Sequence, residues 1–414
     1  MKLTNIHITT SHRNSPVCVL LLSLLLLCLA ACSSGGDIIL VPVEIPDNGQ
    51  LKEPATPTQL YIYIHKPQTA VPTRAYEGDV DPIGQEATIY SLQIWVFTHV
   101  TNKLIGYFSP ESLTALNTNG AEVYQLTIDD TYAETAEASR ESVDVYVLAN
   151  VAASNCHLTL DQRTTRAELE AAVLAHNSTT DAFGLTAPVM SVPENVGLPM
   201  SGVLRNQPVT GTAPVLRLDD GGQMATLSLI RTVSKIRFAF ARETGSQTLT
   251  INSIKMNAEM IPEEQYLFMA ADAPYDRKTC HIGSGYNTAS QSLLAAAIDD
   301  VPEYDLPVYY AWGNEELEPQ EYETRMDEGA AAGHLTQRLY YLRESDKKLQ
   351  GEIKYQIGDG AEQTATFSMV DEGGFSRNHA WTVYAYQAQA RLQVVVVDLT
   401  QWKTKENDHD FYNW

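Results

Sequence analysis

The sequence predicts an all-β protein built from β-sandwich domains. Three observations lead to this fold class: short stretches that alternate apolar and polar residues recur along the chain, turn-forming residues separate them, and helix-start signals are scarce. No short-period repeat is apparent. Setting aside an N-terminal targeting segment and a polar linker leaves roughly 350 residues, which is enough for about two domains.

Residues 1–31 have the pattern of a signal peptide. Lys2 and Arg13 precede an apolar run from Val17 to Ala31, which is shorter than the ~20 residues of a membrane-spanning helix. The run ends in Leu29-Ala30-Ala31-Cys32, which resembles the bacterial lipobox, in which the cysteine sulfur is lipidated and the cysteine becomes the N-terminus. We therefore expect acyl chains such as palmitate on Cys32 and an outer membrane lipoprotein. An ordinary signal peptide with a chance cysteine is the alternative.

Residues 32–57 are rich in Ser, Gly, Pro and Asp, a composition typical of a tether. The formal net charge is −23, and loss of residues 1–31, which hold two basic residues and no acid, makes it −25. Such a chain repels nucleic acid, so no nucleic-acid partner is expected. The acids are dispersed, which favours a solvated acidic surface over a cation-binding one.

The first domain is expected over residues 58–221. Alternation of apolar and polar residues predicts strands at 60–65, 87–97, 104–108, 123–128 and 143–150. The turn Thr101-Asn102-Lys103 joins two of them as a hairpin. A loop that carries Arg74 separates the first strand from the second.

One helix is expected in this domain. Thr165 and Glu168 have the spacing of a capping box, and Leu169, Val173 and Leu174 follow at helical spacing. We expect this helix to end near residues 176–177.

The second domain is expected over residues 222–414. Its predicted strands are 224–240, 249–256, 306–312, 339–342, 352–357, 364–370, 381–386 and 391–398. Of the five cysteines, Cys156 and Cys280 remain for the folded body. They could pair in an oxidising compartment, but two buried thiols in separate domains suit the sequence equally well.

No catalytic or metal-binding motif stands out. The chain has no His-Glu-x-x-His pair, no Cys-x-x-Cys and no nucleophile elbow, so neither an enzyme nor a cofactor is expected. A sugar-binding platform made of Tyr304, Tyr309, Tyr310, Trp312 and Tyr322 is one alternative. Aromatic residues that alternate between core and surface of short strands are the simpler interpretation.

The chain as a whole resembles the fimbrillin family, the lipoprotein-derived type V pilins of anaerobic Gram-negative bacteria. No single motif is specific, but their order spans nearly the whole chain. The segments that carry the resemblance are Leu29–Cys32, Ile89–Phe97, Val145–Asn150 with the helix after it, Leu198–Gly202, Leu229–Ile236, and Phe375–Trp381 leading to a last strand and Trp402. The resemblance implies two tandem transthyretin-like β-sandwich domains with one or two short helices.

The resemblance also implies cell adhesion and assembly of a fimbria, or pilus, by strand exchange. In that family an Arg-specific protease cuts behind the first strand, which departs and is replaced by a neighbour's C-terminal strand. Here the cut would fall between Arg74 and Ala75. The removable strand and the candidate donor region would be Leu60, Tyr61, Ile62, Tyr63 and Ile64, and Leu392, Val394, Val396, Trp402, Phe411 and Trp414.

Several alternatives stay open at this point. The run 392–397 is either the donor or the last core strand, with the donor in the tail beyond it. Expected partners are other fimbrial subunits, the outer membrane, the protease, and a host or bacterial surface ligand. The chain is a stalk or tip subunit at the cell surface, or a lipid-anchored fimbrial anchor, or a non-polymerising surface lipoprotein that binds carbohydrate or protein.

Overall fold

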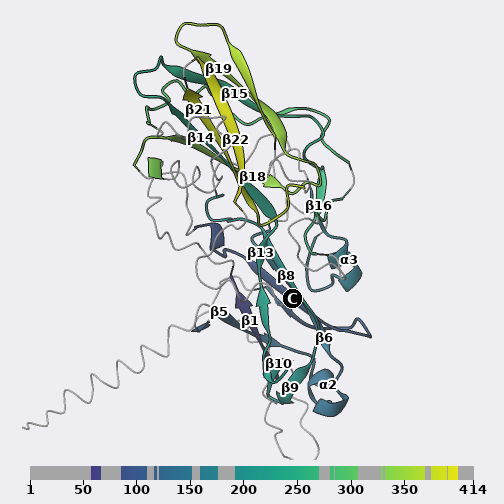
Figure 1. The fold of residues 1–414 in the computed structure, drawn as a ribbon. Helices are drawn as coiled ribbons and strands as arrows, with labels where there is room; N and C mark the ends of the chain where they lie inside the picture. The colour runs from purple at the N-terminus through teal and green to yellow at the C-terminus, as the bar shows by residue number, and fades with distance from the viewer. Residues whose placement is uncertain are drawn as a thin grey trace, which may run out of the picture. The chain divides into compact units, whose positions relative to one another are not determined.

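The fold was analysed in a computed structural model of the chain (Figure 1). It describes residues 57–66, 85–109, 116–118, 121–151, 159–175, 192–269, 280–283, 285–305, 328–329, 332–368, 374–388 and 390–399. All of these belong to one unit of the chain, Thr56–Trp414.

The first sandwich consists of two sheets. In one, the strand order is β11 (Gln223–Met224), β10 (Val215–Asp220), β1 (Gln59–His65), β5 (Ala121–Thr127), β4 (Leu116–Thr118), with β12 (Thr226–Ser228) also paired to β1 and β9 (Val209–Thr212) to β10. In the other, the order is β13 (Ile230–Arg231), β8 (Met200–Gln207), β6 (Val143–Ala149), β2 (Leu92–Thr98), β3 (Leu104–Phe108). Side chains from both sheets form one core, which includes Leu60, Ile62, Ile94, Val145 and Leu227.

The second sandwich also consists of two sheets. One has the order β18 (Thr336–Arg343), β14 (Val233–Arg242), β21 (Ala380–Ala388), β22 (Arg391–Leu399), and the other β17 (Gln291–Ser292), β15 (Leu249–Met256), β19 (Gln350–Ile357), β20 (Gln363–Ser368). Its core includes Ile236, Phe238, Ile254, Ile353 and Val383. The all-β sandwich fold predicted from the sequence is therefore confirmed.

Helices are few and short among the described residues. They are α2 (Asp130–Ala133), α3 (Arg166–Glu170) and the 3-10 turns η1 (Gln85–Ala87) and η2 (Glu137–Ser139). The capping box of Thr165 and Glu168 is present at the start of α3. The expected end of this helix near residue 176 is wrong, because Val173 begins strand β7 (Val173–Ala175), which pairs with β16 (Glu264–Tyr266). Pairing with a distant strand overrides the helical spacing of Leu169, Val173 and Leu174.

Burial explains which strands alternate in sequence and which do not. Strands β1 and β19 alternate, because only one face of each lies in a core. Strand β6 is buried at every position. Its second face packs in a third cluster, which holds Tyr146 and Leu148 together with Leu169 of α3 and Phe268 after β16.

The predicted strand over residues 224–240 is broken in the structure. It forms β12, β13 and β14, which pair with β1, β8 and β18 respectively, so the chain leaves one sheet for the next at each break. Residues 223–231 thus pair with strands of the first sandwich, although the predicted domain boundary places them in the second. The pairing partners change at Thr232, whose N–H donates to Pro199 O.

The predicted strand over residues 87–97 is also shorter in the structure. Strand β2 begins at Leu92, and the residues before it have no strand partner. Instead, the side chain of Asn150 accepts from Tyr90 N and Ser91 N and donates to Thr88 O. A side chain takes the place of a paired strand here.

Gly202 marks a close approach of β8 and β12 in the first sandwich. A Cβ at this position would lie 2.7 Å from Ser228 O, a backbone atom that cannot rotate away. We expect Gly202→Ala to lower the free energy of unfolding by about 1–3 kcal/mol, measured by urea denaturation. Thr226→Ala, at a half-buried position of β12, is the control and should change it by less than about 1 kcal/mol. Equal effects would contradict the close approach.

Candidate functional site

Strand β1, which the family resemblance implies is removable, lies inside a sheet and not at its edge. It pairs antiparallel with β5 over its whole length, from Gln59 opposite Thr127 to His65 opposite Ala121. On its other side it pairs parallel with β10 and β12. Taking β1 out of the sheet would therefore leave a slot with unpaired backbone groups along both walls.

The two walls of this slot differ. The β5 wall is continuous, whereas the other consists of β10 opposite residues 59–61 and β12 opposite residues 63–65. Between these two pieces the chain makes a hairpin excursion, in which β11 pairs back onto β10 and a hydrogen bond of 3.2 Å joins Ala225 N to Leu218 O. Gly221 and Gly222, with φ of +61° and +92°, make the turn of this excursion.

The side chains of β1 divide between the two faces of its sheet. Leu60, Ile62 and Ile64 have no exposed surface and lie in the core of the first sandwich. Tyr61 and Tyr63 point to the opposite face and are half-buried. Burial of each aliphatic side chain contributes about 1.5–3 kcal/mol, so β1 supplies a substantial part of the core.

The slot sets clear requirements for any strand that replaces β1. Such a strand has to run antiparallel to β5 and parallel to β10 and β12, and it needs apolar side chains at every second position. The recognition would be mainly backbone pairing with pockets for alternate side chains. This is chemistry for strand addition and not for catalysis.

The structure places only part of the predicted site. Cys32, Arg74, Ala75, Trp402, Phe411 and Trp414 lie outside the described residues. Leu392 and Val394 belong to β22, which pairs with β21 along its length and packs on the core of the second sandwich. Val396 pairs with Val383 in the same ladder. Residues 391–399 therefore act here as the last strand of their own sandwich.

Sequence reasoning missed Glu86, a buried carboxylate that lies between Arg74 and β2. Its Oε1 accepts from Lys235 Nζ at 2.8 Å and from Tyr341 Oη at 2.5 Å, and Arg231 Nε donates to its backbone oxygen at 3.1 Å. Burial alone would raise the pKa of Glu86, but Lys235, Arg231 and the hydrogen bonds outweigh it and hold the pKa below its usual value.

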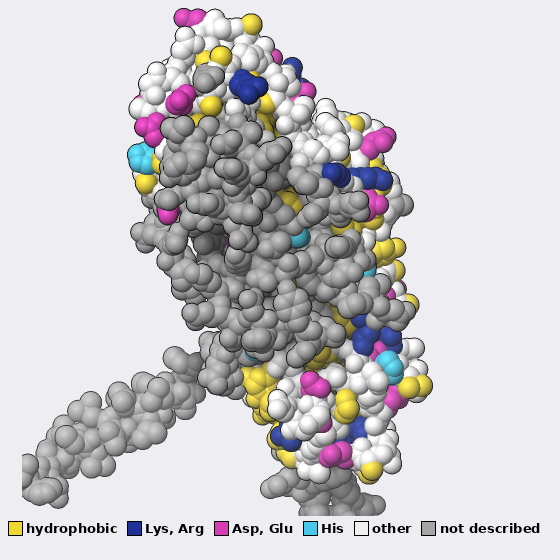
Figure 2. Space-filling model, viewed as in Figure 1, with side chains coloured by type: hydrophobic (Ala, Val, Ile, Leu, Met, Phe, Trp, Pro, Cys, Tyr) yellow, Lys and Arg dark blue, Asp and Glu magenta, His cyan; other side chains and the backbone are white. Residues whose placement is uncertain are grey.

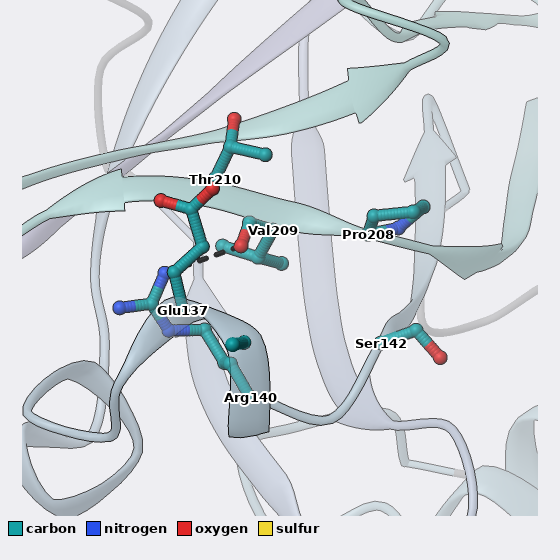
Figure 3. Close-up of a pocket in the computed structure, with 7 residues that line it drawn as sticks. Glu137, Arg140, Ser142, Pro208, Val209 and Thr210 are labelled. Atoms are coloured by element: carbon teal, nitrogen blue, oxygen red, sulfur yellow. Dashed lines mark hydrogen bonds between the residues drawn. The ribbon is translucent and has the colours of Figure 1, made fainter.

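A hollow of about 630 Å³ lies at one end of the first sandwich and is lined by Glu137, Arg140, Ser142, Pro208, Val209 and Thr210 (Figure 3). The guanidinium group of Arg140, which lines the hollow, already has hydrogen-bond partners within the chain. The terminal nitrogens of Arg140 donate to the carbonyl oxygens of Ala133, Thr135, Val209 and Gly211 at 3.0–3.2 Å. We therefore interpret Arg140 as a structural residue that holds neighbouring backbone segments together, and not as part of a ligand site.

The remaining polar groups are those that a metal site would require and those of the residues named from the sequence. No group of three or more His, Cys, Asp or Glu could hold a metal ion there. In Figure 2 the acidic side chains are scattered over the visible face and not gathered in one patch. Cys156 lies outside the described residues, and the thiol of Cys280 lies 3.0 Å from Ser345 O. Of the five aromatic residues of the predicted sugar platform, Tyr304 is described, half-buried and stacked on His334.

The two faces of β1 can be distinguished by substitution. We expect Ile62→Ala to lower the free energy of unfolding by about 2–5 kcal/mol, since it leaves a cavity in the core. Tyr63→Thr, on the outward face, keeps a strand-forming residue and should cost less than about 1 kcal/mol. Urea denaturation of the uncut chain measures both, and a larger loss for Tyr63→Thr would contradict the placement of β1.

Comparisons with known proteins found similar structures. No family model and no curated protein matches the chain. Within the described part, no helix is long and apolar enough to cross a membrane. The tip fimbrial protein Mfa3 of Porphyromonas gingivalis, solved with a C-terminal truncation, is 12% identical with a TM-score of 0.42, covering 83% of this chain and all of that one.

Two proteins of Parabacteroides distasonis are also similar in structure. A proposed cell adhesion protein is 14% identical with a TM-score of 0.43 over 84% of this chain and 98% of its own. A fimbrial assembly protein is 12% identical with a TM-score of 0.38 over 83% of this chain and 97% of its own. The names of these three neighbours describe fimbrial and cell adhesion proteins.

Proposed function

We propose that this chain is a structural subunit of a surface fimbria, in a stalk or tip position, with a role in adhesion. The observation that carries the proposal is the position of β1, which is paired on both sides and fills the core of the first sandwich. A strand in that position, followed in sequence by Arg74, suits removal by an Arg-specific protease and replacement by a strand of another subunit.

The proposed sequence of events begins at the membrane. Lipid on Cys32 holds the chain at the outer membrane as a lipoprotein, with β1 in place. Hydrolysis of the peptide bond between Arg74 and Ala75 then separates β1 from the rest of the chain. The strand departs together with the lipid, and the body passes to a neighbouring subunit.

Magnitudes support replacement over simple loss. The three buried aliphatic side chains of β1 together contribute roughly 5–9 kcal/mol, before any backbone hydrogen bond is counted. A typical domain is stable by about 5–15 kcal/mol in total. A cut chain that lost β1 and gained nothing would be close to unfolding, so a replacing strand is strongly favoured.

The tail beyond Leu399 is the better choice for the donor strand. Residues 391–399 pair with β21, and Leu392 N also donates to Tyr355 Oη at 3.1 Å, so their use as a donor would open the second sandwich. The tail holds Trp402, Phe411 and Trp414, which could fill apolar pockets. We propose that a neighbour's β1 slot accepts this tail.

A fimbrial anchor is the second candidate. The uncut chain has a complete first sandwich, with β1 hydrogen-bonded on both sides, and needs no other subunit to fill it. Such a chain can remain on its lipid at the base of a fibre. The state of its N-terminus distinguishes the two, because a stalk or tip subunit starts at Ala75 and an anchor at lipidated Cys32.

Cleavage can be tested with Arg74→Ala. We expect this variant to stay a lipid-tethered monomer that does not enter fibres, because β1 cannot leave. Electrophoresis of sheared surface material without boiling measures SDS-resistant polymers, and mass spectrometry identifies the N-terminus. Arg163→Ala removes an exposed arginine elsewhere and is the matched control. Normal polymers from Arg74→Ala would overturn the cleavage step.

Donation can be tested by ending the chain at Leu399, which keeps all of β22. We expect the thermal unfolding midpoint to change by less than about 3 °C, since every described strand remains. The truncated chain should be cut normally but should not fill a neighbour's slot, so polymers are lost. Fibres of normal length from this chain would rule out the tail as donor.

A further inference from the structure

The segment from Gln85 to Ser91 joins the predicted cut site to β2, and it belongs to no sheet. It is nevertheless held firmly. Ala87 and Ile89 are buried. Two polar side chains are buried there as well: Glu86, which carries a charge, and Asn150, which hydrogen-bonds to the backbone of the segment. The contacts that hold Glu86 and Asn150 include residues of β13, β14 and β18 and the backbone of residues 88, 90, 91 and 198.

Glu86 connects the segment to both sandwiches. Arg231, which donates to its backbone oxygen, lies in β13 of the first sandwich, whereas Lys235 in β14 and Tyr341 in β18 bind its carboxylate from the second. The side chains of Glu86 and Lys235 are 1% and 9% exposed. Removing one charge of such a pair leaves the other buried without its partner, which is costly.

Asn150 fixes the residues just after Glu86. Its amide oxygen accepts from Tyr90 N at 2.7 Å, and its amide nitrogen donates to Thr88 O at 2.7 Å and to Leu198 O at 3.0 Å. Asn150 has a φ of +59° at the end of β6, a conformation that Asn tolerates better than most residues. One side chain thus bonds backbone groups of Thr88, Tyr90 and Ser91.

We infer that Glu86 and Asn150 act as two clamps: their contacts keep the start of β2 folded after β1 has left. The inference rests on the proposed cut at Arg74, which would turn this segment into a new N-terminal arm. Without a clamp, fraying of that arm would reach β2, whose Ile94 and Val96 are fully buried in the core of the first sandwich. The clamps keep that wall of the core in place while the slot is empty.

The charge of Glu86 gives this role a pH dependence. The groups that face it are Arg231, Lys235 and Tyr341, and together they hold its pKa below the usual value. The stabilisation is therefore fully present above the ordinary carboxyl pKa of about 4.3 and is lost as the pH falls through the lower folded-state value. A merely space-filling role would have no such dependence.

Hydrogen exchange of the full-length chain in detergent, read by mass spectrometry before and after Arg-specific cleavage, tests the inference. After the cut, the wild type should lose protection in residues 59–65 and retain a measurable part of it in residues 92–98. In Glu86→Gln and in Asn150→Gly, exchange of residues 92–98 in the cut chain should rise by about 10–100-fold. Glu303→Gln, which breaks the surface ion pair with Arg242, is the matched control and should behave as wild type.

The outcomes separate this inference from the proposed function. If β1 is not released in any variant, the proposed function fails; if β1 is released but residues 92–98 exchange alike in wild type and both variants, the clamps have no such role.

The pH dependence of the melting temperature gives a second test, on the uncut chain. The melting-temperature difference between wild type and Glu86→Gln should be constant near neutral pH and shrink below about pH 4. Asn150→Gly keeps the backbone conformation and carries the test if Glu86→Gln does not fold.

Discussion

The pairing of β1 on both of its sides is the constraint on which the first sandwich depends. Seven residues close a gap between β5 on one side and β10 and β12 on the other, and they complete the core with Leu60, Ile62 and Ile64. In sequence, a single segment, residues 66–91, joins β1 to β2. Under the proposed function, one cut in that segment would separate β1 from all the strands that follow it.

Buried polar groups around Thr232, where the chain passes from one sandwich to the other, form hydrogen bonds and ion pairs. The crossover between the two sandwiches at Thr232 is bonded to Pro199, and Gln265 donates to Thr232 O. Nearby, Arg377 and Glu344 form an ion pair that is almost fully buried, and Arg377 also donates to Leu267 O at 3.0 Å. Buried ions of this kind add little net stability but specify one arrangement of the chain. Together with the buried pair of Glu86 and Lys235, they fix how the segments around Thr232 pack.

Much of the fold could be predicted from the sequence, because strands with one buried face alternate. Strands β1 and β19 are examples. The prediction failed where distant pairing decides the local structure: Val173 joins β16 and leaves the helix, and residues 224–240 divide among three partners. Glu86 could not be identified, because Lys235 and Tyr341 lie 149 and 255 residues away along the chain. Arg74 and the donor tail remain predictions from the resemblance.

The unequal walls of the β1 slot have a consequence for the geometry of an assembly. Because one wall is antiparallel and the other parallel, a strand inserted backwards would meet the wrong ladder on both sides. A shift by a single residue would turn its apolar side chains toward water. Each joint would then have a single polarity and a single register, so subunits would link head to tail into an open filament whose two ends are chemically different.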